Sequence, residues 1–353
     1  MSSIIKSVGV YYPNNIKRNT DFLQNTFLKK GNIPFDKPSG EIIAKFEQIT
    51  EIKERKIAAD DISVSDMGFF ASRHAIDNAG IDQETIDYII VAHNWGNVNN
   101  CDNYFDPLPN LAARVKGRLE IKNPTCVAYD LLFGCPGWLE ALKQGHMFIQ
   151  SGNAQRVLVV GADAVSRVVE DCDIDSMLFS DGAGAVILEK TEAPNGILSF
   201  KTVSHCLDEI DFLKMGHSYD DQLKDSGLYL KMEGKKVFRY AMENVPAVID
   251  CCLKDAGLEL NDINYFLIHQ ANGKMIKAIG KKLFESHGIK SFNEQVMPLN
   301  VSTMGNNSVA TIPTLLYELQ QKQLNDRGLK KGDIVAFASV GAGMHANCVI
   351  HQF

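Results

Sequence analysis

Five short apolar runs constrain the fold of this chain more than any other feature of its sequence. The runs are continuous and rich in β-branched residues, which is typical of strands buried on both faces. They cover residues 87–94, 156–163, 183–190, 265–272 and 333–343. Stretches with helical periodicity separate them, at residues 64–79, 137–151, 235–256, 272–287 and 308–324. This alternation predicts an α/β fold with helices packed against its sheets.

Two similar segments indicate that the chain is internally duplicated. The turn GCPG at 134–137 opens a helix that leads to the strand RVLVVGAD, and the turn GNNS at 305–308 opens a helix that leads to the strand DIVAFASV. No linker rich in proline, serine or glycine divides the 353 residues. We therefore expect two similar halves, 1–175 and 176–353.

Composition narrows the possible functions. The formal net charge of -7 argues against general binding to nucleic acid or to an anionic membrane. No apolar run reaches the length of about 18 residues that a transmembrane helix needs, and the first residues do not have the pattern of a secretion signal. The eight cysteines are scattered without the spacing of a metal site. We expect a reduced, cytoplasmic protein with no metal centre.

Cys135 is the candidate nucleophile. It lies where an apolar stretch turns into a helix, and Pro136 suits the first position of that helix. A thiol at a helix start lies in the field of the helix dipole, which predicts a lowered thiol pKa. The backbone N–H of Cys135 is also free to face a developing oxyanion. A buried structural cysteine fits the same segment, so Cys135 needs further support.

Two more residues supply that support. His269 ends a predicted strand, where α/β proteins often place functional groups, and Asn306 lies in a glycine-containing turn before a helix. A thiolate with two hydrogen-bond donors is a set suited to acyl transfer. The residue types alone leave both hydrolysis and condensation open.

The motifs around these residues resemble a known family. LFSDGAGAV, HQAN and GNNSVATIP occur in order along the chain, together with ITEIKERK and SVGAGM. On these motifs the chain resembles the ketoacyl synthase III family of the thiolase superfamily over nearly its whole length. The resemblance implies a five-layered, duplicated α-β fold and a homodimer. It also implies a ping-pong reaction, in which an acyl group loaded on Cys135 condenses, with decarboxylation, with malonyl on acyl carrier protein to give a β-ketoacyl thioester. Such reactions serve fatty-acid or related secondary-metabolite biosynthesis.

The resemblance also implies roles for individual residues. His269 and Asn306 match the pair that hydrogen-bonds the thioester oxygen of the extender, where an enolate develops and needs donors. Phe179 matches an aromatic residue near the site. Val340 and Ala342 belong to the glycine-rich turn, and the N–H of Ala342 would complete an oxyanion hole. No cofactor is implied, because phosphopantetheine on the carrier protein or on CoA carries the substrates.

A basic stripe suggests where the carrier protein binds. Lys274, Lys277 and Lys281 fall on one face of a predicted helix directly after His269, and Lys282 flanks them. Acyl carrier proteins are acidic, and the family has basic residues at the places of Lys274, Lys281 and Lys282. A solvated helix face is the alternative reading of this stripe.

Several positions depart from the family pattern. Pro136 follows the nucleophile in place of a small residue, Ala342 and Glu51 replace glycines, and Val340 replaces an aromatic residue. The segment 94–110 is longer than in housekeeping members.

The place where a Trp and an Arg hold the adenine of CoA in the family is also altered. It is occupied here by Ala44 and Gln48. We therefore expect a donor carried on acyl carrier protein.

These residues also bear on other reactions of related enzymes. A thiolase would need a second cysteine where Ala338, Ser339 and Val340 stand, and a hydroxymethylglutaryl synthase would need a glutamate after the run 87–94. Both are disfavoured. An acyltransferase that forms esters or amides without decarboxylation stays open, as does an inactive scaffold subunit.

Overall fold

Two β-sheets form the frame of the molecule. The computed structural model describes residues 2–98, 105–223, 227–324 and 326–353. Within them, the first sheet has the strand order β1–β11–β10–β6–β9 and the second has the order β12–β17–β16–β15. Strands β6, β9 and β10 are mutually parallel, as are β15 and β16, whereas β11 and β17 run antiparallel to their neighbours. The bounds are β1 Ser2–Tyr11, β6 Tyr88–His93, β9 Val127–Leu132, β10 Arg156–Ala164, β11 Asp181–Thr191, β12 Gly196–Ser204, β15 Tyr265–Ile268, β16 Ile334–Gly341 and β17 His345–Gln352.

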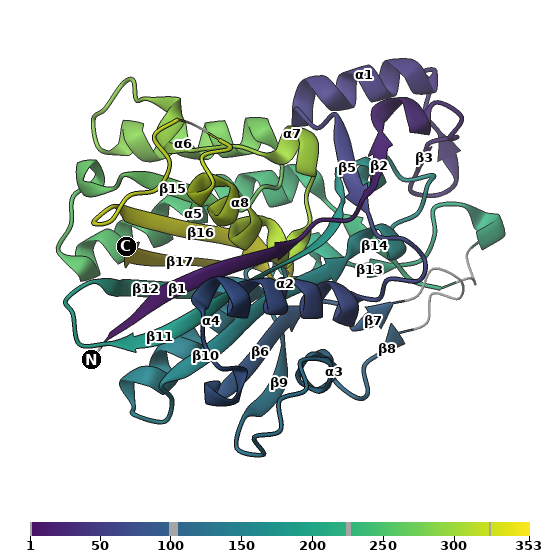
Figure 1. The fold of residues 1–353 in the computed structure, drawn as a ribbon. Helices are drawn as coiled ribbons and strands as arrows, with labels where there is room; N and C mark the ends of the chain where they lie inside the picture. Colours follow the sequence, from purple (N-terminus) through teal and green to yellow (C-terminus); the bar gives the residue numbers. More distant parts are fainter. Residues whose placement is uncertain (1, 99–104, 224–226, 325) are drawn as a thin grey trace.

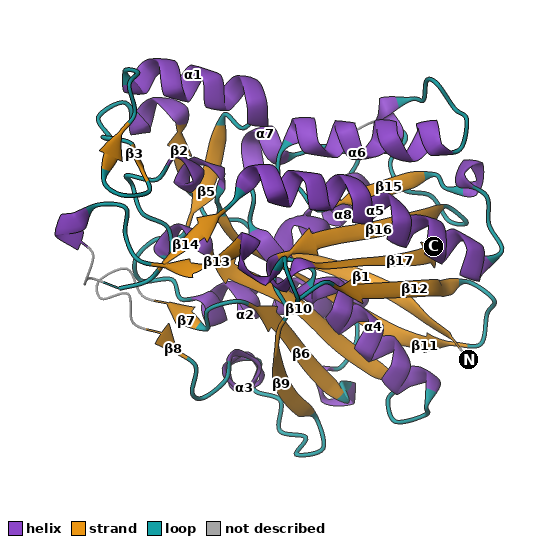
Figure 2. Ribbon diagram, turned by 180° about the vertical axis from the view of Figure 1, so that it is seen from behind, coloured by secondary structure: helices purple, strands orange, loops and turns teal. Residues whose placement is uncertain are grey.

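Helices form three layers around these sheets (Figures 1 and 2). Helices α2 (Val64–Ala79) and α3 (Leu111–Arg118) pack on the first sheet, and α5 (Gly234–Ala256) and α6 (Gly273–Ser286) pack on the second. Helix α4 (Gly137–Gln150) contacts strands of both sheets, and so does α8 (Thr311–Gln320). The chain therefore has the five-layered α/β architecture that the resemblance implied.

The apolar core follows the layers. One buried cluster fills the space between the sheets around Trp138 and Leu315, and two others lie under the outer helices. In α4, a side chain at Gly145 would meet Val157 at 3.1 Å, and one at Gly137 would meet Ala92 at 3.3 Å. The small residues of this helix therefore let it approach the strands of the first sheet closely.

The smaller elements gather at one end of the two sheets, on the right in Figure 1. A fourth apolar cluster holds much of this region together. Its elements are β2 Asn15–Arg18, β3 Leu28–Lys29, β4 Ile33–Pro34, α1 Ser39–Thr50, β5 Glu54–Ile57, β7 Asn97–Val98, β8 Phe105–Asp106, β13 Leu213–Gly216, β14 Tyr229–Met232 and α7 Val301–Met304.

The expected division of the chain at residue 175 stays a prediction. Strand β11 lies after that point, yet it pairs with β1 and β10 of the first sheet. A junction between Thr191 and Gly196 would keep each sheet within one half. Part of the segment 94–110, residues 99–104, lies outside the described residues. No helix of the described residues is long and apolar enough to span a membrane.

Candidate active site

Two turns from different halves of the chain meet at Cys135. The first turn leaves β9 and contains Gly134, whose φ is +63°, and the second follows β16. A Cβ at Gly341 would lie 2.7 Å from the backbone nitrogen of Cys135. A Cβ at Gly134 would lie 2.7 Å from the carbonyl oxygen of Ala342. Side chains at these glycines would force the turns apart, so glycine at both places lets Ala342 lie beside the nucleophile.

Cys135 opens onto an apolar cavity of about 160 Å³. Phe179 and Ala342, two of the residues expected near the site, line this cavity. Val340, the third, is buried in the core of the second sheet and is not among the lining residues. Most of the remaining wall is apolar and comes from Trp95, Val165, Leu213, Met215 and Leu230. Such a cavity fits the hydrocarbon part of an acyl group.

Burial dominates the acidity of the nucleophile. Cys135 lies just before α4, separated from it by Pro136, and it is only partly exposed. Desolvation raises the pKa of the thiol to about 11, although a hydrogen bond from Ser308 lowers it. The expectation of a lowered pKa is therefore wrong for the enzyme without substrate, because burial disfavours the thiolate more than its surroundings favour it.

His269 is a buried, neutral imidazole. Desolvation lowers its pKa to about 3. Its Nδ1 lies 2.7 Å from the hydroxyl oxygen of Thr311, and that hydroxyl also lies 3.1 Å from the carbonyl oxygen of Ser308. The Thr311 hydroxyl has a single hydrogen. When that hydrogen goes to Nδ1 and not to the carbonyl of Ser308, the imidazole carries its own hydrogen on Nε2 and can donate there.

Asn306 is fixed on both its backbone and its side chain. Its N–H donates to the carbonyl of Leu178, and its carbonyl accepts from the N–H of Ser180, each at 2.9 Å. Its side-chain Oδ1 accepts from the N–H of Ser308 at 2.9 Å. Because Oδ1 is occupied, the Nδ2 group is left to donate to a ligand.

Ser308 connects the three predicted residues. Its hydroxyl oxygen lies 3.5 Å from the sulfur of Cys135, and its N–H donates to Asn306. Its carbonyl oxygen lies 3.1 Å from the hydroxyl of Thr311, the partner of His269. The structure thus brings Cys135, His269 and Asn306 into one hydrogen-bonded set. Sequence reasoning missed Ser308, although it lies in the quoted motif GNNSVATIP only two residues after Asn306.

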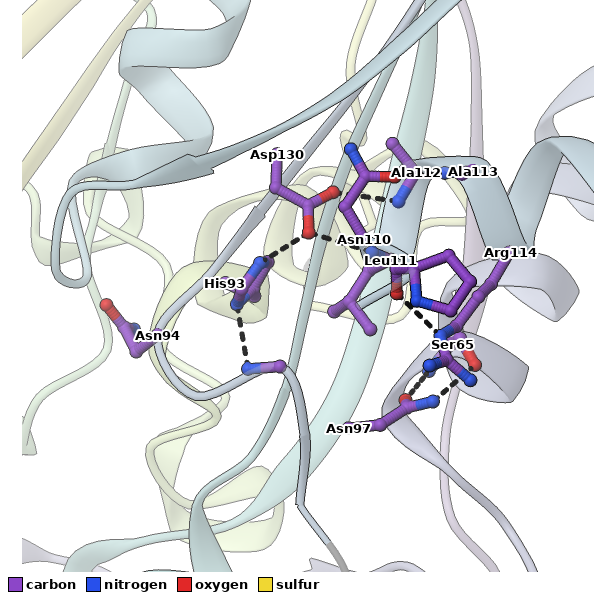
Figure 3. A network of polar contacts seen from close by, with 12 residues as sticks. Ser65, His93, Asn94, Asn97, Asn110, Leu111, Ala112, Ala113, Arg114 and Asp130 are labelled. Carbon is purple, nitrogen blue, oxygen red and sulfur yellow. Dashed lines mark hydrogen bonds and ion pairs between the residues drawn. The ribbon is translucent and has the colours of Figure 1, made fainter. Parts of the chain in front are cut away.

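A buried polar clamp holds the turn that carries Asn94 and Trp95 (Figure 3). His93 accepts from the N–H of Gly96 at 3.0 Å and lies 2.8 Å from Asp130, a residue of β9. The Asp130 carboxylate also accepts from the first two N–H groups of α3, each at 2.8 Å. Figure 3 shows Asn94 on the opposite side of this turn from Asp130, so the clamp fixes the point from which Asn94 and Trp95 reach the cavity.

The four predicted carrier-binding lysines are exposed on α6. Both carboxylate oxygens of Glu51 lie 2.8 Å from the ammonium of Lys277, and Lys281 lies 3.8 Å from Glu285. Glu51 also packs against Gly273, at the start of the helix. The stripe is therefore partly neutralised. No cluster of three or more potential metal ligands is found in the part of the chain that the structure describes.

Comparison with known proteins identifies the family. The family description 3-oxoacyl-[acyl-carrier-protein (ACP)] synthase III matches residues 129–206, and its C-terminal counterpart matches residues 253–353. The β-ketoacyl-[acyl-carrier-protein] synthase III 1 of Vibrio cholerae is 34% identical, with 100% of both chains covered. The chain belongs to the ketoacyl synthase III family.

Solved structures agree with this assignment. The β-ketoacyl-[acyl carrier protein] synthase III of Thermus thermophilus superimposes with a TM-score of 0.81 at 30% identity, with 99% of each chain covered. The priming β-ketosynthase from the R1128 polyketide biosynthetic pathway also gives 0.81, at 27% identity, covering 100% of this chain and 96% of that one. The two matched regions contain Cys135 and the pair His269 and Asn306, respectively.

The raised thiol pKa has a measurable consequence. Alkylation by iodoacetamide requires the thiolate, so in the enzyme without substrate the rate at Cys135 should rise about tenfold per pH unit from about pH 7 to about pH 9, without a plateau. The rate is measured by mass spectrometry, and a Cys135→Ala variant gives the background from the exposed Cys206 and Cys251. A plateau below about pH 8 would show a low-pKa thiolate instead.

Proposed function

We propose that this ketoacyl synthase III loads an acyl group on Cys135 and then condenses it, with loss of CO2, with malonyl carried on acyl carrier protein. The main support for giving these roles to particular residues is one hydrogen-bonded set. It joins Cys135, Asn306 and His269 through Ser308 and Thr311. The product is a β-ketoacyl thioester. The reaction needs no metal or cofactor beyond the phosphopantetheine arms of its substrates.

The first half-reaction uses the sulfur of Cys135. The sulfur attacks the carbonyl carbon of the donor thioester, a new C–S bond forms, and the donor thiol leaves with the proton that Cys135 gave up. The N–H groups of Cys135 and Ala342 would hold the developing oxyanion. The apolar cavity receives the acyl chain.

The second half-reaction uses His269 and Asn306. Loss of CO2 from the malonyl thioester leaves an enolate, whose oxygen accepts hydrogen bonds from Nε2 of His269 and Nδ2 of Asn306. The enolate carbon attacks the acyl carbon, a C–C bond forms, and Cys135 leaves as a thiolate that regains a proton. Both donors are neutral and already oriented, so the protein does not have to reorganise at this step.

The acidity of His269 favours condensation over the alternatives. Hydrolysis, or ester and amide formation, requires a base that removes a proton from water, an alcohol or an amine. An imidazole whose pKa burial lowers to about 3 is a weak base, but it can still donate a hydrogen bond. The site therefore suits decarboxylative condensation better than activation of such an acceptor.

We also propose a homodimer that forms along β9. This strand is at the edge of the first sheet and has only β6 as a partner in the described residues. Val127 and Leu132, at its two ends, are 47% and 66% exposed. A long free edge with exposed apolar residues favours pairing with a second strand.

The expected cytoplasmic location stays a prediction.

The two half-reactions should separate on mutation. We expect His269→Ala and Asn306→Ala to slow malonyl decarboxylation by about 10²–10³-fold, because each removes one oxyanion donor, and to retain acylation of Cys135. Release of CO2 and the mass of the acylated protein are measured in parallel, and Cys135→Ala should carry no acyl group. Asn307→Ala, at a buried neighbour whose Nδ2 has no partner among the described residues, is the matched control. Near-normal condensation in both variants would contradict the proposed roles.

The lysine stripe on α6 should bind acyl carrier protein. Reversing Lys274 and Lys281 to Glu should raise the KM for malonyl on the carrier protein and weaken its dependence on salt, because attraction to an acidic partner is lost. Lys331→Glu is the control, since this exposed lysine precedes β16 at the end opposite Gly341. An unchanged KM at low ionic strength in the double variant would show that the stripe is a solvated helix face that does not bind the carrier protein.

The donor should arrive on carrier protein rather than on CoA. Ala44 and Gln48 lie in a groove of about 640 Å³ whose other residues include Glu47 and Glu51. Without an aromatic ring or an arginine, contacts worth about 0.5–2 kcal/mol each are missing. The groove also contains Lys53, and Glu51 is paired with Lys277, so it offers no excess of positive charge to the phosphates of CoA.

This preference is tested with matched donors. The rate of Cys135 acylation is compared for one acyl chain on CoA and on carrier protein, over several chain lengths. We expect the carrier-bound donor to react faster. The double variant Ala44→Trp, Gln48→Arg should gain activity with the CoA form, because it restores a ring and a cation. A consistent preference of the unaltered protein for CoA would overturn the proposal.

A further inference from the structure

We propose that Ser308 is a further catalytic residue, whose hydroxyl donates a hydrogen bond to the sulfur of Cys135 and stabilises its thiolate. The inference rests on the proposed function only for the use of that thiolate, which forms when Cys135 is loaded and again when it leaves the acyl group. The contact itself is a property of the folded protein. The hydroxyl oxygen and the sulfur are 3.5 Å apart, within the usual range for sulfur.

The hydrogens around Ser308 can be assigned one by one. The Nδ2 group of Asn94 has two hydrogens, and it donates one to Asp163 at 2.8 Å and one to the hydroxyl oxygen of Ser308 at 3.0 Å. The backbone N–H of Asn94 also donates to Asp163, at 2.9 Å, which fixes the orientation of the side-chain amide. Since Ser308 accepts from Asn94, its single hydrogen is free to point elsewhere.

Two acceptors compete for that hydrogen. One is the sulfur of Cys135, and the other is the carboxylate of Asp163, which also interacts with Ser308. Asp163 already accepts two hydrogen bonds from Asn94. Burial raises its pKa to about 6, so it is still a carboxylate near neutral pH and competes for the hydrogen while Cys135 is a thiol. A thiolate is a much stronger acceptor than a thiol. The hydroxyl should therefore turn toward the sulfur when Cys135 becomes charged.

The backbone holds Ser308 in the required place. Its φ of +54° is in the left-handed region, which residues other than glycine rarely adopt. The conformation persists because its N–H donates to Oδ1 of Asn306, and its carbonyl oxygen lies 3.1 Å from the hydroxyl of Thr311. Strain of this kind is maintained where the surroundings over-determine a position, often at functional sites. The same backbone groups that orient Asn306 thus place the Ser308 hydroxyl at the sulfur.

The test measures alkylation of Cys135 by iodoacetamide in the whole protein, at one pH near 8, with no acyl donor present. Ser308→Ala and Ser308→Gly both remove the hydroxyl, and glycine also relieves the left-handed backbone. We expect both variants to react about three- to tenfold more slowly, because a charge-assisted hydrogen bond to the thiolate is lost while a less acidic thiol is a somewhat better nucleophile. If the hydroxyl had no role, the smaller side chain would open the site and alkylation would be faster.

Asn94→Ala provides an independent variant. It leaves the hydroxyl of Ser308 in place but removes the donor that orients it, so the hydroxyl is drawn to Asp163 and alkylation slows by a similar factor. The double variant Ser308→Ala, Asn94→Ala should then be no slower than either single variant. Ser339→Ala is the matched control, because it removes a buried hydroxyl that has no partner among the described residues. It should leave the rate unchanged.

The outcomes are distinct from those that test the condensing function, because iodoacetamide needs no acyl or malonyl substrate. Unchanged or faster alkylation in both Ser308 variants would overturn the proposal. The proposal would also be overturned if the double variant were slowed by the product of the two single-variant factors. Independent effects of that kind would mean that Asn94 and Ser308 have separate roles. Thermal unfolding of each variant shows whether the fold is kept.

Discussion

The close approach of two turns is the constraint on which the rest of the site depends. The turn at Cys135 belongs to the first sheet and the turn at Gly341 to the second, and they touch where neither Gly134 nor Gly341 has a side chain. Helix α4 starts at this contact and contacts strands of both sheets. The nucleophile is therefore anchored to both sheets at once. A single added methyl group at either glycine would disturb the frame and the chemistry together.

Burial then sets the electrostatics. The same dense packing raises the pKa of the Cys135 thiol, lowers that of His269 and raises that of Asp163. In each case the neutral form is favoured, so the site without substrate holds an uncharged thiol and an uncharged imidazole. A neutral resting site suits a reaction that creates negative charge twice, provided that hydrogen-bond donors face the places where the charge develops.

The sequence predicted the architecture well because its signals were local and periodic. The helices at 64–79 and 137–151 agree with α2 and α4 to within a residue. Cys135, His269 and Asn306 were chosen as candidates because each was expected at the end of a strand or the start of a helix, within motifs that resemble the family. The raised pKa of Cys135 was not predicted, since desolvation depends on all the atoms that surround the sulfur. Ser308, Asn94 and Asp163 were missed for a similar reason, because their contacts join distant parts of the chain.

The clamp of His93 and Asp130 has a consequence for how such an enzyme can diversify. Asp130 binds the start of the segment 94–110 through His93 and its end through the first N–H groups of α3. Both ends of the loop are thus tied to one carboxylate on β9. The entropy of closing a loop grows only slowly with its length, so residues can be inserted between fixed ends at little cost in stability. New acyl preferences can then evolve in this loop, as in an antibody loop on a constant scaffold, while the nucleophile and its donors stay unchanged.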